Sequence, residues 1–367
     1  MFHSTEWLLG ALGLLLTLGT APAHAQVDSV RASNLPGRQV AERAYNAGLA
    51  SLTAHNYPAA LNSFNQALTE RPDFAPALAN RAATQLALKN YPAAVADYDQ
   101  ALKLEPGAYA HYAGRAQAHE AAGQVAEAEA DYGQALGANA AYAPAWYGRG
   151  VLRFEKGDYQ LAYADFSGAL KADSTLAYAY HDRGSASLQM GHYDAAVADY
   201  SRALCRQPDL LPALLNRAAA ERRDEQLPAA LRDYDAYLAH KTDNPLAYCN
   251  RGLTRYESKD YAGAVADFDK AIALKATYAL AWNNRAAAEL KLKQYAKANA
   301  DATEALRLNP QYAEAYLNRG HAREMLRQPD DACHDWHQAA ALGLTVGNSY
   351  AAAAGCTDPP GVAPERK

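Results

Sequence analysis

The stretch "CNRGLTRYESKDYAGAVADFDKAI", residues 249–272, holds a pattern that recurs along most of the chain. Gly252 belongs to a series of positions, spaced by 34 residues, at which every residue is glycine or alanine: Gly48, Ala82, Ala116, Gly150, Gly184, Ala218, Gly252, Ala286 and Gly320. Twelve residues after each of them comes an alanine, from Ala60 to Ala332. Sixteen residues after all but one of them comes an aromatic residue. Nine repeats, numbered 1 to 9 below, therefore fill residues 41–346 without an insertion.

Each repeat has the pattern of a helical hairpin. Apolar residues recur at three- and four-residue spacing in two blocks of about fourteen, as on the buried face of a helix. A polar turn such as "KGDY", "MGHY" or "SKDY" separates the blocks. Pro72, Pro106, Pro208 and Pro310 lie near the ends of repeats, where proline prevents a helix from continuing. The sequence therefore predicts an all-α protein.

The period, the paired small residues and the aromatic positions resemble the tetratricopeptide repeat (TPR), over more than four fifths of the chain. The resemblance implies a right-handed α-solenoid of nine TPR hairpins at residues 41–346, with a concave face lined by the first helix of each pair. Stacked repeats need a cap at the exposed apolar end. We expect the alanine-rich stretch at residues 347–356 to form this capping helix.

Both ends of the chain differ from the repeats. Residues 1–25 resemble a signal peptide, because an apolar run ends in small residues with Ala23 and Ala25 in the arrangement that signal peptidase accepts. The alternative is that this run is kept as a membrane anchor. We expect an exported bacterial protein, periplasmic or secreted, with a linker at residues 26–40 and a disordered tail at residues 357–367. No membrane span is expected after cleavage.

A charged residue stands where a packed helix usually carries leucine. The seventh position of repeats 2 to 9 is arginine, and an aspartate follows sixteen residues later each time. Repeat 1 lacks both, with Ala47 and Ser63 in their places. The predicted structural ion pairs are Arg81 with Asp97, Arg115 with Asp131, Arg149 with Asp165, Arg183 with Asp199, Arg217 with Asp233, Arg251 with Asp267, Arg285 with Asp301, and Arg319 with Asp335.

An ion pair inside each hairpin explains why the two residues occur together. Burying either charge alone is costly, whereas a bidentate pair satisfies both. The alternative, in which eight arginines face a ligand, leaves the matched aspartates unexplained.

Composition and motifs argue against several classes of function. The formal net charge is -5 and no segment concentrates Lys and Arg, so a nucleic-acid surface is not expected. The sequence has no HExxH, GxSxG, Walker or CxxC motif. The histidines are scattered without the spacing of metal ligands, and the three-residue spacing of His334 and His337 does not predict a metal site. We expect no catalytic residues, no metal and no cofactor, and therefore no enzyme.

The repeat's geometry places positions 2, 5, 6, 9, 12 and 13 on the concave face. The residues predicted there to bind a partner are Tyr147, Phe154, Tyr178, His181, Asp182, Arg222, Arg223, Asn250, Tyr256 and Asn284. Asparagine recurs at position 6, where its amide can hydrogen-bond an extended peptide, although asparagine is also simply common there. One hypothesis is an interaction scaffold that holds a protein or peptide segment in this groove. The other is a module that binds carbohydrate or envelope glycan through its aromatic residues.

Four cysteines remain in a chain that we expect to be exported. Cys333 lies on the second helix of repeat 9 and Cys356 ends the predicted cap, at positions that face each other in antiparallel helices. Disulfides persist outside the cytosol, so we predict a bridge between these two. The alternative is two independent thiols. Cys205 and Cys249 are two repeats apart, too far for a bridge.

Overall fold

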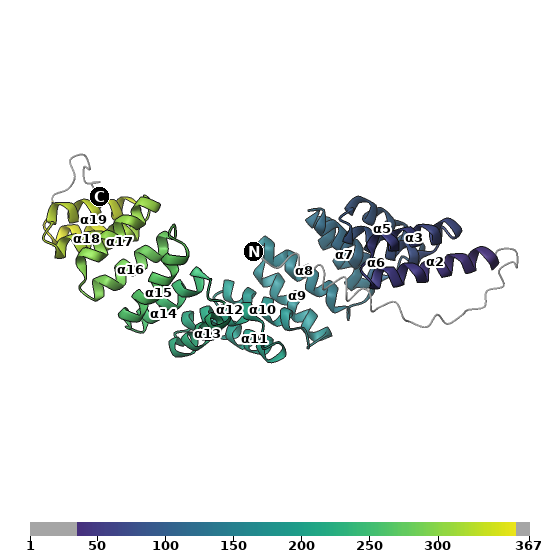
Figure 1. Ribbon diagram of the computed structural model, residues 1–367, viewed down its shortest axis with the longest axis horizontal. Coiled ribbons are helices and arrows are strands. Elements are labelled where there is room, and N and C mark those ends of the chain that lie inside the picture. Colours follow the sequence, from purple (N-terminus) through teal and green to yellow (C-terminus); the bar gives the residue numbers. More distant parts are fainter. Residues whose placement is uncertain (1–34, 357–367) are drawn as a thin grey trace, which may run out of the picture. The chain divides into compact units, whose positions relative to one another are not determined.

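The computed structural model describes residues 35–356 as helices joined by short turns, with no strand in that range (Figure 1). Its nineteen helices confirm the predicted all-α fold of paired helices. The predicted signal peptide, most of the predicted linker and the predicted tail lie outside the described residues. The described residues divide into two compact bodies, 35–191 and 192–356.

The N-terminal body contains four helical hairpins and the first helix of repeat 5. Its helices are α2 (Leu35–Thr53), α3 (Tyr57–Glu70), α4 (Ala75–Ala87), α5 (Tyr91–Leu104), α6 (Tyr109–Ala121), α7 (Val125–Ala138), α8 (Ala143–Lys156), α9 (Tyr159–Ala172) and α10 (Ala177–Gln189).

The C-terminal body contains the second helix of repeat 5, four hairpins and one final short helix. Its helices are α11 (Tyr193–Arg206), α12 (Leu211–Arg223), α13 (Leu227–His240), α14 (Pro245–Glu257), α15 (Tyr261–Leu274), α16 (Ala279–Lys291), α17 (Tyr295–Leu308), α18 (Ala313–Met325), α19 (Pro329–Ala341) and α20 (Val346–Ala353).

The turn inside each hairpin is formed by a left-handed residue at position 15. Glycine supplies it at Gly123, Gly157 and Gly191, where φ is 76°, 86° and 78°. In the other six hairpins the same conformation is taken by a residue with a side chain, such as Lys259 with φ 66°. The turn is therefore set by the hairpin geometry, and glycine is favoured but not required.

The small residues of the pattern allow the two helices of a hairpin to touch. A Cβ atom on Gly252 would lie 2.8 Å from the ring of Phe268, and one on Gly150 would lie 2.8 Å from the ring of Phe166. Phe166 and Phe268 are fully buried. In every hairpin that lies within one body, except that of repeat 8, alanines and one buried aromatic ring thus make a large part of the core.

The first helix differs from the sequence-based prediction at its start. α2 begins at Leu35, inside the stretch 26–40 that was expected to be a linker. Pro36 lies in its first turn, where proline is tolerated, and no proline follows before the turn at His55. The helix therefore extends six residues ahead of repeat 1.

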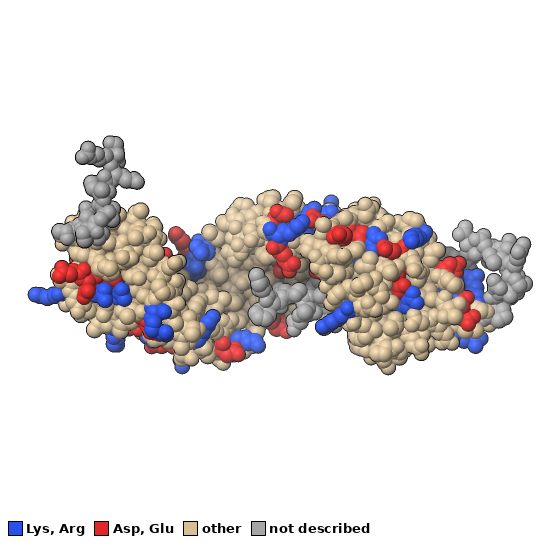
Figure 2. Space-filling view, turned by 90° about the horizontal axis from the view of Figure 1, so that it is seen from above, with Lys and Arg blue, Asp and Glu red and all other residues tan. Residues whose placement is uncertain are grey.

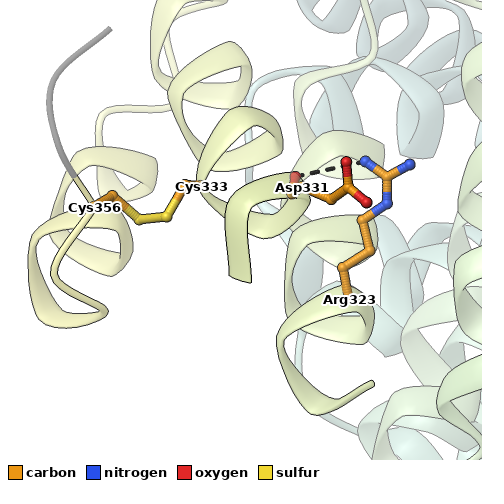
Figure 3. Close-up of a disulfide and its surroundings, with 4 residues drawn as sticks. All are labelled: Arg323, Asp331, Cys333 and Cys356. Atoms are coloured by element: carbon orange, nitrogen blue, oxygen red, sulfur yellow. Dashed lines mark hydrogen bonds between the residues drawn. A yellow bond between two sulfur atoms is a disulfide. The ribbon is translucent and has the colours of Figure 1, made fainter. Parts of the chain in front are cut away.

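The last helix, α20, packs against α19 and covers the end of repeat 9. Ala351 is buried against Ala332 and Trp336. Cys356 follows α20 and forms a disulfide with Cys333 of α19, with 5.7 Å between their Cα atoms (Figure 3). In the same view Arg323 lies on the other side of α19, where its Nη1 donates to the Asp331 carbonyl oxygen.

Candidate functional site

The arginines at position 7 hold aspartates of their own hairpins. In seven of the eight predicted pairs, Nε and Nη2 donate to the two carboxylate oxygens over 2.5–3.0 Å. The aspartate side chains are at most 12% exposed. The pair of Arg183 with Asp199 spans the division between the two bodies and stays a prediction. In these seven pairs, two of the three guanidinium nitrogens are therefore engaged within the protein itself and are not available to a ligand.

The remaining nitrogen, Nη1, reaches in the opposite direction along the sequence. In six of the eight repeats it donates to the residue sixteen positions earlier, on the second helix of the preceding repeat. These acceptors are Asn65, Asp99, Ser167, Ser201, Asp235 and Asp269. In repeats 2, 3, 6, 7 and 8 the position-7 arginine therefore connects two successive second helices. The sequence shows polar residues sixteen positions before these arginines, but because their types vary, the contacts were not predicted.

A second set of side-chain contacts links the first helices of successive repeats. Each contact joins residues 35 apart. Asn80 donates to the Tyr45 hydroxyl over 3.1 Å, and Asn318 donates to the Asn283 amide oxygen over 2.9 Å. Some asparagine side chains at position 6 therefore form hydrogen bonds between repeats. This weakens the hypothesis that all of them hydrogen-bond the backbone of a bound peptide.

Two of the predicted partner-binding residues in the N-terminal body are buried, contrary to expectation. Tyr147 on α8 is 7% exposed and His181 on α10 is 4% exposed. The Tyr147 hydroxyl donates to one Asp182 oxygen, and His181 Nδ1 lies 2.8 Å from the other. Burial and the Asp182 carboxylate raise the pKa of Tyr147 well above its ordinary value. Position 5 therefore faces the neighbouring first helix, and these two side chains support Asp182.

The other predicted residues of this body remain accessible. Tyr178, at the start of α10, is 43% exposed. Phe154 of α8 is half-buried, with its ring 5.3 Å from that of Tyr159. Asp182 is also half-buried. The first helices α8 and α10 thus present one exposed aromatic ring, one partly exposed ring and a carboxylate.

An acidic pair that the prediction missed lies on the same layer of helices. Glu120 of α6 and Glu155 of α8 are 35 residues apart, at positions 12 and 13 of successive repeats. The Tyr132 hydroxyl donates to Glu120 Oε2 over 3.1 Å. Burial, together with the charge of Glu155, raises the pKa of Glu120 to about 7. The first helices α6, α8 and α10 of the N-terminal body therefore carry three acidic side chains, Glu120, Glu155 and Asp182.

In the C-terminal body the equivalent positions form an ion pair. Arg222 of α12 donates Nη1 to Glu257 of α14 over 2.7 Å, and the Arg222 side chain is only 14% exposed. This contact corrects the prediction of Arg222 as a free cationic contact. Arg223 is exposed and Tyr256 is half-buried, with its ring 5.3 Å from that of Tyr261.

The two asparagines predicted in this body are half-buried. Asn284 Nδ2 lies 3.9 Å from the sulfur of Cys249, and the Asn250 carbonyl accepts from Thr254. Cys249 is a buried free thiol and Cys205 is an exposed one. Of the predicted residues in the C-terminal body, Arg223 is therefore the most accessible to a partner.

Charged side chains of both signs are interspersed over the face seen in Figure 2, without a continuous basic tract. Within residues 35–356, no three His, Cys, Asp or Glu side chains come together as metal ligands would. None of the helices in that range combines the length and apolarity that crossing a membrane requires.

Comparisons with known proteins agree with the repeat pattern. Models of the tetratricopeptide repeat match residues 45–110, 113–177, 177–210 and 246–278. No curated protein matches the chain. The C-terminal part of a TPR repeat-containing protein from Cytophaga hutchinsonii is a solved structure with a similar fold, at 18% identity and a TM-score of 0.53. That match covers 65% of this chain and 97% of the other.

Two further solved structures show weaker likeness. Tom70 from yeast matches over 86% of this chain and 96% of its own, at 14% identity and a TM-score of 0.43. YrrB, described as a TPR protein with an unusual peptide-binding site, matches over 50% of this chain and 95% of its own, at 22% identity and a TM-score of 0.48. The family models together span more than half of the sequence, and the chain belongs to the tetratricopeptide repeat family.

Proposed function

We propose that this protein is a non-enzymatic adaptor that holds an extended segment of a partner protein against its first-helix layer. TPR proteins typically mediate protein–protein interactions and are usually non-enzymatic. The observation that carries the proposal is the surface of α6, α8 and α10, where Tyr178 and Phe154 lie on the same layer of helices as the carboxyl groups of Glu120, Glu155 and Asp182.

The chemistry of this surface defines the partner. An exposed tyrosine ring offers a large contact area with little loss of conformational freedom. Glu120, Glu155 and Asp182 favour a cationic side chain, because opposite charges guide association and specify register. The partner segment should therefore combine an apolar or aromatic residue with lysine or arginine. The glycan alternative receives less support, since Tyr147 is buried and cannot stack on a sugar.

A peptide library tests this function. The purified chain should select peptides enriched in basic and apolar residues. The Glu155→Lys variant should select fewer basic residues, because it replaces one carboxylate by a cation on the same surface. Polysaccharide co-sedimentation is run in parallel. Selection of no peptide, together with depletion of the chain by a polysaccharide, would favour the glycan-binding function instead.

We further propose that the protein works in the bacterial envelope or the secreted space. The support is the sequence of residues 1–25, which resembles a cleaved signal peptide. Cell fractionation and N-terminal sequencing test it. Mature protein beginning at Gln26 in the periplasm or medium is expected, and full-length protein in the cytosol would rule it out.

A further inference from the structure

Three repeats place a second arginine beside their aspartate. Arg153, Arg255 and Arg323 occupy position 11, and their Nη1 atoms donate to Asp165, Asp267 and Asp335 over 2.8–2.9 Å. Each of these aspartates is therefore held by two guanidinium groups, one from position 7 and one from position 11. Two planar cations around one carboxylate neutralise it and satisfy its oxygens.

Repeat 8 carries the opposite charge at this position. Glu289 takes the place of the second arginine, next to Asp301. Its side chain is buried, with the residue only 3% exposed. Glu289 Oε2 has no hydrogen-bond partner among the described side chains and backbone. A buried acceptor without a partner is destabilising, so this site lacks the donor that repeats 4, 7 and 9 contain.

A cavity opens at the same place. It has a volume of about 260 Å³ and lies between α15, α16 and α17. Its lining residues are Val265, Asp269, Arg285, Glu289, Lys297, Ala300 and Asp301. Arg285 is already used, because it donates to both oxygens of Asp301 and to Asp269. Glu289 and Lys297 are the charged lining residues that take no part in these hydrogen bonds of Arg285.

We propose that this cavity binds a guanidinium group supplied by another molecule, which takes the place of the internal arginine of repeats 4, 7 and 9. The acceptors are then the carboxylates of Glu289 and Asp301. Asp301 stands at the position whose aspartates accept from Arg153, Arg255 and Arg323 in the other three repeats. The ligand class is an alkylguanidinium, either a small molecule or the side chain of an arginine in a peptide. This site belongs to the C-terminal body and does not depend on the proposed function.

The charge state of Glu289 gives the site a pH dependence. Burial raises the pKa of Glu289 to about 7, and the neighbouring Asp301 carboxylate adds to the effect. Arg285 and Lys297 act in the opposite direction, and Asp269 is the remaining charged group of the lining. A guanidinium binds the ionised carboxylate, so its apparent affinity should rise about tenfold from pH 6 to pH 8.

The first experiment is an NMR titration of the full-length protein with methylguanidinium, and separately with N-acetyl-arginine amide and a short peptide containing one arginine. Saturable shifts should centre on the amides of α16 and α17. Saturation by methylguanidinium alone would identify a small-molecule site, and saturation only by the peptide would identify a partner's arginine. Both outcomes support a guanidinium site, and no saturable shift with any of the three probes would refute it.

A substitution supplies the matched test. Glu289→Arg rebuilds the arrangement of repeats 4, 7 and 9, so it should remain folded and weaken guanidinium binding at least tenfold. Glu70→Arg makes the same charge change at an exposed residue of α3 and should leave binding unchanged. Equal loss in both variants would show a general charge effect, and retained binding in Glu289→Arg would exclude this cavity.

Lys297 provides a further check, because it could itself satisfy Glu289. If the cavity serves a ligand, Lys297→Ala removes a repelling charge and strengthens guanidinium binding. Weaker binding in Lys297→Ala would contradict the proposal.

Discussion

Arg251 and Arg285 occupy the same position in successive repeats but have different neighbours. Asp267, the partner of Arg251, also accepts from Arg255 over 2.8 Å. Asp301, the partner of Arg285, has the carboxyl group of Glu289 beside it. Removal of the position-7 arginine should therefore have unequal consequences in the two repeats.

We predict that Arg285→Ala costs about 3–5 kcal/mol of unfolding free energy, because it leaves a buried carboxylate unpaired. Arg251→Ala should cost less, about 1–3 kcal/mol, because Arg255 still donates to Asp267. Urea unfolding of the two variants measures the difference. The same cost in both, or a larger cost for Arg251→Ala, would contradict the role given to position 11.

Two buried glutamates should make stability depend on pH. Burial raises the pKa of Glu221 and of Glu289 to about 7, from an ordinary value of 4.5. A carboxyl group whose pKa is higher in the folded chain favours folding while it is protonated. This contribution is complete below pH 4.5 and is lost as the pH rises through about 7.

The double variant Glu221→Gln, Glu289→Gln should therefore lose the part of this dependence that these two groups cause, whereas Glu120, whose pKa is also raised to about 7, keeps its own part. Between pH 5 and pH 8 the unfolding midpoint of the original chain should fall relative to that of the variant. Urea unfolding at a series of pH values measures it. Parallel curves for the two proteins would mean that these glutamates have ordinary pKa values in the folded state.

At the scale of single elements, the hairpin turns and the capping helix are where a local change should alter stability for one identifiable reason. Gly157 has φ 86° and an added Cβ atom would meet no atom within 4 Å. The effect of a side chain there is therefore purely conformational. Gly157→Ala should destabilise the chain by about 1 kcal/mol.

Gly107 is the matched control, since an added Cβ atom also meets nothing there and its φ is not in the left-handed region. Gly107→Ala should leave the unfolding free energy unchanged or slightly higher. Thermal unfolding of both variants tests the pair. A loss as large for Gly107→Ala as for Gly157→Ala would show that the turn conformation is not the cause.

The cap depends on its covalent link. α20 has only eight residues, mostly small, and is too short to be stable as an isolated helix. The disulfide closes a loop of 23 residues, which stabilises the folded chain by about 3 kcal/mol in the chain-entropy model. Reduction should therefore speed hydrogen exchange in α20 and leave α16 unaffected.

Peptide mapping without reductant checks the pairing directly, on protein from an oxidising compartment. Recovery of both cysteines as free thiols would show that the disulfide between Cys333 and Cys356 does not form. Unchanged exchange in α20 after reduction would show that packing of Ala351 against Trp336 holds the cap by itself.

The sequence predicted the elements better than it predicted the environment of single residues. The 34-residue period and the turn residues were enough for the hairpins, because each depends on local spacing. The aspartate partners were found because one residue type recurs. The contacts of Nη1 were missed because asparagine, aspartate and serine share that role. Tyr147 was wrongly predicted to be exposed. Position 5 belongs to the first-helix layer, but its side chain packs against the first helix of the following repeat.

At the scale of the whole molecule, the question is which layer of helices meets a partner. Exposed apolar residues occur on both layers: Tyr178 of the first helix α10 is 43% exposed, and Leu161 of the second helix α9 is 49% exposed. Neither contributes much to the core, so alanine at either position should leave the unfolding midpoint nearly unchanged.

The measurement that tests the proposed function most directly is the affinity of these two variants for a peptide selected by the original chain. Tyr178→Ala should weaken binding at least tenfold, because a central aromatic contact carries a large share of binding energy. Leu161→Ala should bind like the original chain. Full affinity in Tyr178→Ala, or a loss confined to Leu161→Ala, would contradict binding on the first-helix layer.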